Sequence, residues 1–405
     1  MIQKAKHESM RNNNTLMIIE YIKNFGPVTK KMILEKTGLS WGAISNITTE
    51  LLSKRIIIEY THKESSVGRT PTYLQINSNE NLLIGIDINI SWLSLVLTDL
   101  SSNIKESIRY ELKSNEKDSI ILQAIELIHG LMNKASITKD KILGIGIAMH
   151  GSVDVDKGVS IFAPHFKDWH NVPIKSIFEK EFGIPVFLEH DPNCMAMSEK
   201  WFGSASGCDN YLFLRLSTGI GMSIIINDSI YRGADGNAGE FGHIILDVNG
   251  AKCNCGNYGC LEAYASVDSI IQKARDALQN GRSNILKELV GSGDSVNLKT
   301  IISAYRQGDD YIKRIVDDVC TFIGIGICNL INLFNPELII IAGDLIDYSD
   351  IFIEKIKKVV IQNRWRSSSV NIITSKLESN SAALGAAAII IQKFFKGEEI
   401  NDSNK

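Results

Sequence analysis

Three cysteines and one histidine near the middle of the chain constrain the fold more than any other feature of the sequence. The cysteines, Cys253, Cys255 and Cys260, lie within a stretch of eight residues, and a histidine, His243, lies ten residues before the first of them. Three thiolates and one imidazole can close a tetrahedral zinc shell, and such a zinc is structural because a catalytic zinc keeps one position open. Glycines between the cysteines favour this interpretation, since chelation needs tight turns. We therefore predict a structural Zn²⁺ site, with a reduced, buried cysteine cluster as the alternative.

Length and composition indicate a soluble protein of several domains. A chain of 405 residues fits two or three domains, and a hydrophobic content of 44% is ordinary for a globular protein. The seven cysteines form no disulfide ladder, which fits a reducing cytoplasm. Residues 1–14 are polar, unlike a signal peptide, and the longest apolar run, 382–391, is too short to span a bilayer. We therefore expect a cytoplasmic protein with no membrane insertion.

Charge is distributed unevenly along the chain. Residues 1–80 hold 11 Lys and Arg against 7 Asp and Glu, whereas the remaining residues hold 32 against 39. A basic first segment followed by an acidic body indicates a nucleic-acid-binding module joined to a domain of another kind.

The basic segment, assigned to residues 1–78, has the pattern of a DNA-binding domain built from three helices. Apolar residues recur at helical spacing over 15–25 and predict the first helix. Thr29 is positioned to cap a second helix, which ends at Gly38, and Ser40 is positioned to cap a third. Two helices joined by a short turn that contains glycine are typical of the helix-turn-helix motif.

The residues after the third helix predict a β-hairpin over 55–60 and 72–76, with Arg69 in its tip. The hairpin would complete a winged helix-turn-helix, an all-α unit with a β wing. Short polar side chains on the third helix can reach base edges, and arginines can bind phosphates or enter a minor groove. The predicted DNA contacts are Arg11, Ser40, Trp41, Ser45, Asn46, Thr49 and Arg69. Further candidates are Thr48 on the same polar face and the phosphate ligands Lys54 and Arg55. The alternative is a winged helix that binds protein.

The acidic body alternates between strands and helices in two related halves. A strand, a short turn and a second strand are predicted over 82–97 and again over 211–226. Helices and further strands follow each hairpin, including a long helix over 310–334. Two α/β lobes with a cleft between them form the two-lobed, actin-like (ribonuclease H-like) fold of sugar kinases, in which ligands lie at the carboxyl ends of strands. We assign residues 79–200 to the first lobe and 201–405 to the second, with the C-terminal helix packing back on the first.

The segment from Gly239 to Glu262 resembles the signature of the ROK family, which contains bacterial sugar kinases and sugar-responsive transcriptional repressors. The resemblance covers the whole chain, from the helix-turn-helix and the Gly-Arg-x-Pro tip of the wing to both lobes and the zinc element. Kinases of this family generally lack the N-terminal DNA-binding domain. The layout is therefore similar to the repressor branch, whose familiar members include repressors linked to glucose, N-acetylglucosamine and xylose.

This resemblance implies a sugar site rich in carboxylates. Asp191 corresponds to the catalytic base of the family's kinases, and His190 precedes it where those kinases commonly have asparagine. Carboxylates are suited to binding a sugar because they accept charge-assisted hydrogen bonds from its hydroxyl groups. The sugar-binding residues implied in this way are Gly151, Ser152, His190, Asp191, Glu240, His243 and Glu262. Of these, His243 would also bind the zinc.

The turns that hold nucleotide in the family's kinases are altered in this chain. Asp87 is followed by Ile88-Asn89-Ile90-Ser91, whereas the kinases have a Gly-Gly-Thr turn whose N–H groups hold phosphate. The β-branched side chain of Ile90 resists the positive φ that glycine adopts. The turn from Ser217 to Gly221 is better preserved, but Ala342-Gly343-Asp344 places an acid on the nucleotide side. Because phosphoryl transfer depends on positioning and charge stabilisation, we predict no kinase activity and no catalytic residue.

Together these features predict a sugar-responsive repressor of carbohydrate uptake or catabolism genes, acting as a homodimer or dimer of dimers on a palindromic DNA operator. The effector would be a sugar or a sugar phosphate, and lobe closure would change the geometry of the paired DNA-binding domains. One alternative is a bifunctional ATP-dependent ROK sugar kinase with a regulatory DNA-binding head, in which Asp191 is catalytic. Another is an interaction protein whose head binds protein. The sequence is equally compatible with an effector that releases DNA and one that promotes DNA binding.

Overall fold

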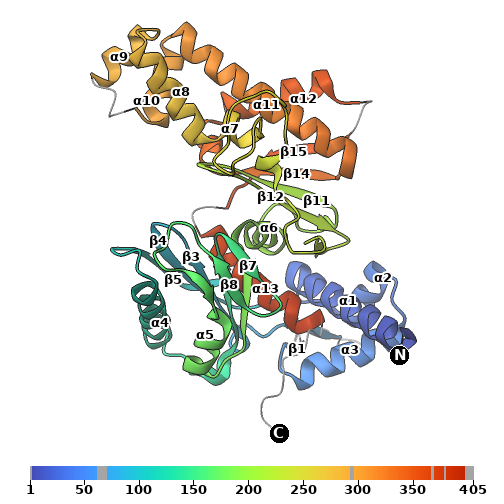
Figure 1. Cartoon of the computed structure of the whole chain (residues 1–405). Helices are drawn as coiled ribbons and strands as arrows, with labels where there is room; N and C mark the ends of the chain where they lie inside the picture. The colour runs from blue at the N-terminus through green and yellow to red at the C-terminus, as the bar shows by residue number, and fades with distance from the viewer. Residues whose placement is uncertain (1, 62–70, 292–295, 366–368, 378–379, 397–405) are drawn as a thin grey trace. The chain divides into compact units, whose positions relative to one another are not determined.

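The fold consists of two compact units (Figure 1). Unit 1 contains Met1–Phe202 and Leu377–Lys405, and unit 2 contains Gly203–Lys376. The computed structural model describes residues 2–61, 71–291, 296–365, 369–377 and 380–396. The C-terminal segment therefore belongs to unit 1, although it follows unit 2 in the sequence.

The first part of unit 1 consists of three helices and a two-stranded antiparallel sheet. These elements are α1 (Ile2–Phe25), α2 (Lys30–Thr37), α3 (Trp41–Ser53), β1 (Ile57–Thr61) and β2 (Thr72–Ile76). As predicted, Thr29 Oγ1 accepts a hydrogen bond from the Met32 N–H at 3.2 Å. Ser40 Oγ likewise accepts one from the Ala43 N–H at 3.3 Å, which starts α3. Gly38 ends α2 in the left-handed region with φ 67°.

The first helix is longer than the sequence pattern predicted. α1 begins at Ile2, whereas apolar periodicity placed the start at Thr15. Residues 2–14 carry too few apolar side chains to show a periodic pattern, but they contain neither glycine nor proline and can extend a helix that is already nucleated. Fully buried isoleucines form the core between the three helices: Ile18, Ile19, Ile22, Ile33 and Ile44.

The second part of unit 1 is a five-stranded sheet in the order β10-β6-β3-β4-β5. Its strands are β3 (Leu82–Ile88), β4 (Trp92–Thr98), β5 (Ile104–Glu111), β6 (Ile142–Met149) and β10 (Val186–His190). Strands β3, β4 and β5 form an antiparallel meander, and β6 and β10 continue the sheet in parallel with β3. The hairpin of β3 and β4 confirms the one predicted over 82–97.

Helices and a small second sheet cover one face of this sheet. Apolar side chains of α4 (Lys117–Lys134) and α5 (Ile174–Phe182) share a buried cluster with β3, β4, β6 and β10. The three-stranded sheet of β7 (Ser152–Asp154), β8 (Val159–Phe162) and β9 (His170–Val172) follows β6, and none of these strands was predicted from the sequence. Its strands are too short to show an alternating pattern. A short 3-10 turn, η1 (Lys139–Lys141), precedes β6.

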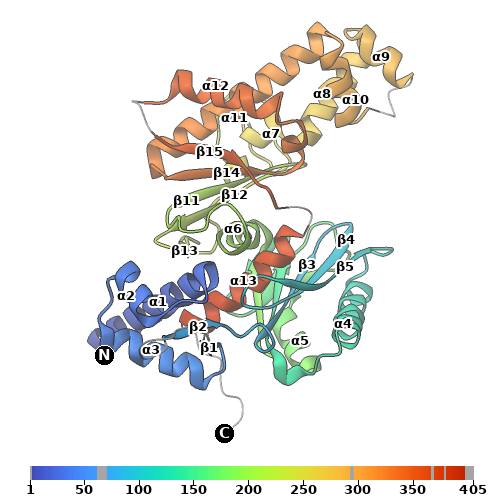
Figure 2. The same ribbon diagram turned by 180° about the vertical axis from the view of Figure 1, so that it is seen from behind.

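Helices α6 (Asp191–Phe202) and α13 (Ser381–Lys396) pack together on the opposite face (Figures 1 and 2). The approach of α13 leaves no room for side chains beneath it. A Cβ atom at Gly85 of β3 would lie 1.9 Å from Ala383 O, and one at Gly146 of β6 would lie 1.9 Å from Ala386 O. Since successive strand residues face opposite sides, Gly85 contacts α13 while its neighbours enter the other core. The backbone of α13 therefore lies directly on the two central strands.

Unit 2 repeats the strand order of unit 1. Its sheet, β13-β12-β11-β14-β15, is again an antiparallel meander extended by two parallel strands. The strands are β11 (Tyr211–Leu216), β12 (Ile220–Ile226), β13 (Ser229–Ile230), β14 (Leu338–Ala342) and β15 (Asn371–Thr374). Helical elements are η2 (Phe241–His243), α7 (Leu261–Ala265), α8 (Val267–Gln279), α9 (Asn284–Val290), α10 (Leu298–Arg306), α11 (Asp310–Phe334), η4 (Asp344–Tyr348) and α12 (Phe352–Asn363). The second predicted hairpin and the long helix are thus confirmed.

Helix α11 is the one helix among the described residues that is long and apolar enough to cross a membrane. Of an apolar stretch of 18 residues in this helix, 61% is buried inside the protein. Helix α11 packs against α7, α8 and α12. The apolar character of α11 is therefore accounted for by the core of unit 2.

Candidate functional site

The four predicted metal ligands converge in unit 2. The ligand atoms of His243, Cys253, Cys255 and Cys260 all lie within 4.8 Å of one another. The Sγ atoms of Cys255 and Cys260 are 3.7 Å apart, and Cys253 Sγ lies 3.9 Å from His243 Nδ1. Sulfur ligands of a tetrahedral ion with bonds of about 2.3 Å are separated by about 3.8 Å. The donor set and its spacing therefore fit a four-coordinate metal ion.

Backbone hydrogen bonds and glycines shape the loop that carries these ligands. The Gly259 N–H donates to Ala251 O at 2.8 Å, and the Leu246 N–H donates to Gly259 O at 2.9 Å. Gly259 has φ 74°, and a Cβ at this position would lie 1.6 Å from Asp247 O, so a side chain is excluded on both counts. Gly256, with φ 97°, makes the turn between the cysteines. The structure therefore supports the predicted role of these glycines as tight-turn residues.

The thiols of the cluster have contrasting environments. Cys255 is exposed, and a hydrogen bond from the Asn257 backbone lowers the pKa of its thiol. Cys260 is buried, and this desolvation raises the pKa of its thiol to about 12. Because metals bind the thiolate form, binding at Cys260 requires the loss of a proton.

Three of the predicted sugar-binding residues lie beside this cluster. The Nδ1 atom of His243 faces Cys253. The Nε2 atom of the same ring lies 3.9 Å from Glu240 Oε2. Glu262 Oε2 accepts a hydrogen bond from the Ile220 N–H at 2.9 Å. Glu262 also lines a polar pocket of about 420 Å³, a volume within the range of small-ligand sites. A metal on His243 Nδ1 would leave the Nε2–H of this residue as a hydrogen-bond donor.

The other predicted sugar-binding residues lie in unit 1, at the ends of two neighbouring parallel strands. Asp191 is the buried first residue of α6, where the helix dipole favours a negative charge. The adjacent His190 ends β10 and has its Nε2 atom 3.5 Å from Asp191 Oδ1. Gly151 and the exposed Ser152 follow β6, which pairs with β10. A Cβ at Gly151 would lie 2.2 Å from Phe162 O, and its φ is 83°, so this position also requires glycine.

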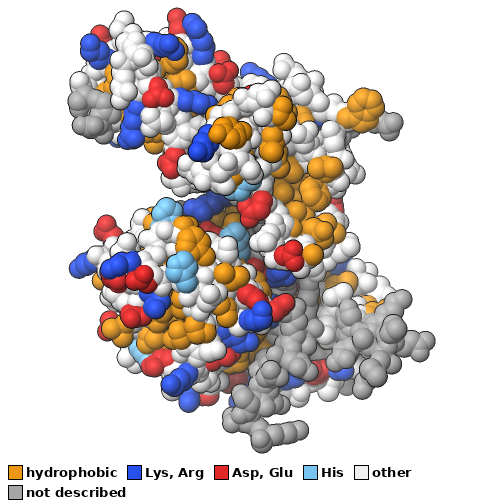
Figure 3. Space-filling view, viewed as in Figure 1, with side chains coloured by type: hydrophobic (Ala, Val, Ile, Leu, Met, Phe, Trp, Pro, Cys, Tyr) orange, Lys and Arg blue, Asp and Glu red, His pale blue; other side chains and the backbone are white. Residues whose placement is uncertain are grey.

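No sequence pattern pointed to His150, which lies between β6 and Gly151. Its Nδ1 atom is 3.3 Å from Ile88 O, and its buried Nε2 atom has no hydrogen-bond partner among the described residues. Burial lowers the pKa of the imidazole, and the carboxylate of Asp191 acts in the opposite direction. Histidine side chains gather on this surface of unit 1 (Figure 3). A signal that could have identified His150 is its place between a buried strand and a glycine of the predicted sugar site.

The two turns on the predicted nucleotide side lie in different units. In unit 1, Ile90 is 43% exposed in the β3–β4 turn, which is closed by a hydrogen bond from the Asn89 N–H to Trp92 O at 3.0 Å. In unit 2, the Ser217 hydroxyl donates a hydrogen bond to Asp344 Oδ2. The acid expected from the sequence thus lies against the second turn.

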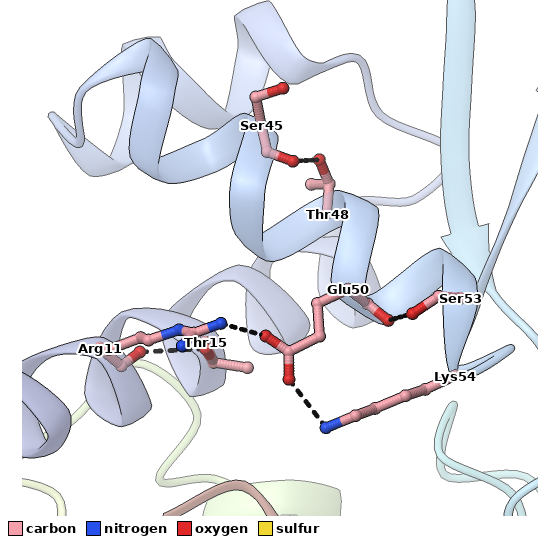
Figure 4. Close-up of polar contacts among 7 residues, drawn as sticks. All are labelled: Arg11, Thr15, Ser45, Thr48, Glu50, Ser53 and Lys54. Carbon is pink, nitrogen blue, oxygen red and sulfur yellow. Dashed lines mark hydrogen bonds and ion pairs between the residues drawn. The ribbon is translucent and has the colours of Figure 1, made fainter.

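The predicted DNA-contact residues of α3 are partly exposed. Trp41, Asn46 and Thr49 are exposed, and Ser45 is half-buried. The prediction that Thr48 lies on the exposed polar face is wrong, because this residue is fully buried. Thr48 follows Ile44 by four residues and shares its apolar face. Its hydroxyl donates to Ile44 O at 2.8 Å. The same hydroxyl lies 3.2 Å from Ser45 O (Figure 4).

Two of the candidate phosphate ligands are joined by one carboxylate. Arg11 Nη2 lies 2.5 Å and Lys54 Nζ 2.8 Å from the oxygens of Glu50, which ties α1 to the end of α3 (Figure 4). The hydrogen bond from Lys54 lowers the pKa of Glu50 most, and Arg11 adds to it. Arg55 pairs with Glu80 at 3.5 Å. Arg69 lies outside the described residues.

Comparison with solved structures identifies the class of fold. A ROK family transcriptional regulator, described as a homolog of the E. coli MLC protein, matches with a TM-score of 0.82 and 26% identity, over 96% of this chain and 98% of that chain. The two sheets of identical strand order and this match define the actin-like sugar-kinase fold.

Curated relatives include both regulators and enzymes. A putative xylose repressor from Caldicellulosiruptor sp. (strain Rt8B.4) is 32% identical over 96% of this chain and 97% of its own length. A glucokinase from Thermotoga maritima is 33% identical over 77% of this chain and 98% of its own length. The profile of the ROK family matches residues 83–393. The chain belongs to the ROK family.

Proposed function

We propose that this chain is a cytoplasmic, sugar-responsive, DNA-binding transcriptional repressor of carbohydrate uptake or catabolism genes. One observation carries the proposal. The alignment with the xylose repressor extends over 96% of the chain and so includes most of the three-helix segment, whereas the alignment with the glucokinase covers 77%. The glucokinase is therefore aligned over nearly its whole length, but it matches only the body of this chain.

In this proposal the three helices and the β1–β2 hairpin form a winged helix-turn-helix that binds double-stranded DNA. In this proposal α3 enters the major groove, and the exposure of Trp41, Asn46 and Thr49 supports this assignment. Ser40 caps the same helix and Ser45 lies on its second turn, while Arg11 and Arg69 would bind phosphates. A palindromic operator read by a homodimer, or by a dimer of dimers, follows from the symmetry of paired half-sites.

The proposed effector is a sugar or sugar phosphate bound by Gly151, Ser152, His190, Asp191, Glu240, His243 and Glu262. The carboxylates among them would accept hydrogen bonds from hydroxyls, and His243 Nε2–H would donate one. Zn²⁺ is the proposed ion at the cysteine cluster, since three thiolates and one imidazole close a structural zinc shell. Zinc would supply rigidity, holding the loop between Glu240 and Glu262 in one conformation.

A second candidate function is an ATP-dependent sugar kinase with a regulatory head. The similarity to the glucokinase and the placement of Asp191 at the start of α6 favour it. Ile90 in the first turn and the Ser217–Asp344 hydrogen bond in the second oppose it, because both disfavour a bound phosphate. We therefore expect no phosphorylation of glucose, xylose or N-acetylglucosamine by the intact chain with ATP and Mg²⁺. Activity that disappears in Asp191→Asn would favour the kinase instead.

The proposal is tested by selecting duplexes from a random library with the full chain and measuring affinity for the enriched duplex by fluorescence anisotropy. We expect an inverted repeat, and an affinity that falls steeply with salt because phosphate contacts release counterions. Adding sugars and sugar phosphates one at a time should change that affinity. Failure to bind any duplex at about 100 mM salt, where such contacts persist, would exclude a DNA-binding function.

A further inference from the structure

Lys23 links the first helix of the chain to the end of α6. Lys23 Nζ donates a hydrogen bond to Trp201 O and lies 5.1 Å from the centre of the Trp201 ring. The Ser102 hydroxyl donates to the same carbonyl at 3.3 Å. One residue away, the buried Lys200 pairs with Glu20 of α1 at 4.0 Å. Helix α1 also packs against α13, which itself packs on α6 (Figures 1 and 2).

This lysine acts as a cap supplied from another part of the chain. The last four carbonyls of a helix have no partner within the helix, and a cation is favourable at that end because of the helix dipole. Lys23 provides both a donor and a charge to the end of α6. Burial lowers the pKa of Lys23 to about 8, so this contact has a substantial desolvation cost. An apolar side chain could pack against Trp201 without this desolvation cost.

The other end of the same helix carries a residue of the effector site. Asp191 is the first residue of α6 and Trp201 the last but one, so they lie about 15 Å apart on one element. Residues 191–201 are buried with the exception of Met195. The chain leaves unit 1 directly after this helix, at Gly203. Because a helix is a rigid element, a displacement of Asp191 would be transmitted along α6 to Trp201 O.

We propose that Lys23 is the positioning residue that couples the effector site to the DNA-binding helices. This inference rests on the proposed function. An effector that binds Asp191 shifts α6, and Trp201 O moves with it. While its hydrogen bond to Trp201 O holds, Lys23 moves α1 together with α6. A displacement of about 1 Å breaks this hydrogen bond and releases α1. The ion pair of Arg11 with Glu50 passes the change from α1 to α3.

The experiment compares Lys23→Met, Lys23→Arg and the control Lys31→Met in the full chain. Lys31 is an exposed lysine of α2. The probes are the duplex enriched by the wild type and D-xylose, D-glucose, N-acetyl-D-glucosamine and their phosphates. Sugar affinity is measured by calorimetry, and duplex affinity is measured with and without the sugar that gives the largest effect. In the wild type we expect a change of about fivefold or more in duplex affinity.

In Lys23→Met the sugar should bind as in the wild type, and the duplex should bind in its absence, but the sugar should no longer change duplex affinity. Lys23→Arg should retain part of the response and Lys31→Met all of it. A full response in Lys23→Met overturns the inference while leaving the proposed function in place. A wild type that responds to no sugar overturns the proposed function.

Hydrogen exchange on the wild type provides a second test that does not depend on a variant folding. Sugar should change protection at residues 18–25 of α1 together with the end of α6. A change confined to the sugar site, with α1 unaffected, would also overturn the inference.

Discussion

Replacing Lys23 by methionine should remove a specific pH dependence from the stability of unit 1. The pKa of Lys23 is lowered from 10.5 to about 8 mainly by burial, and among the neighbouring charges Glu20 raises it and Lys200 lowers it. The folded protein therefore binds fewer protons at this site than the unfolded chain between about pH 8 and pH 10.5. Stability rises with pH wherever the unfolded state binds more protons, so the wild type should become more stable across this window.

The size of the effect follows from the shift. A difference of about 2.5 pKa units corresponds to roughly 3 kcal/mol between the protonation states. About 2 kcal/mol of this should be regained between pH 7 and pH 9.5, where most of the linked proton release takes place. Methionine keeps the apolar contact with Trp201 and has no proton to lose, so Lys23→Met should lack this increment.

The assay is urea unfolding at pH 7 and pH 9.5, followed by circular dichroism, with Lys31→Met as the matched control. Groups other than the two substituted lysines titrate in all three proteins, and Lys31→Met shows the effect of losing an exposed lysine. The difference between Lys23→Met and the wild type, compared with that control, therefore isolates Lys23. The midpoint of the wild type should rise relative to Lys23→Met as the pH is raised. Parallel pH profiles for the two proteins would refute the assignment of a half-buried, desolvated lysine at this position.

Three further changes test other parts of the structure. Cys255→Ser should abolish metal binding in elemental analysis and lower the melting temperature, whereas Cys208→Ser, outside the cluster, should leave metal content unchanged. Gly259→Ala should destabilise unit 2 by about 2 kcal/mol or more in thermal denaturation, because of its positive φ and the contact with a backbone carbonyl. Asn46→Ala should reduce preference for the selected duplex over random DNA in anisotropy titrations, and Thr48→Val should not, since only the former side chain is exposed.

The elements that the sequence predicted well are those whose signals are local. Caps at Thr29 and Ser40 depend on side chains within three residues of the amides that they bind. The metal ligands lie within eighteen residues of one another, so their spacing alone indicated that they could converge.

The features that escaped prediction depend on contacts between distant segments. Lys23 occupies the position four residues after Ile19 on an otherwise apolar helix face, but its acceptor is 178 residues away in the sequence. The burial of Thr48 reflects which side of α3 meets the other helices, which a mixed polar sequence does not reveal. The β7–β9 sheet has strands of three and four residues, which are too short for an alternating pattern.

The closeness of α13 to the central strands of unit 1 has a consequence during protein synthesis. Gly85 and Gly146 face a helix that is translated some 240 residues after the second of them. At about 5–20 residues per second, a ribosome needs on the order of ten seconds or more to cover that distance. Throughout this interval one face of the sheet stays uncovered and open to chaperones, while the helices proposed to read DNA are already complete. A nascent chain that stops before Ser381 would thus present those helices on a unit 1 that still lacks α13.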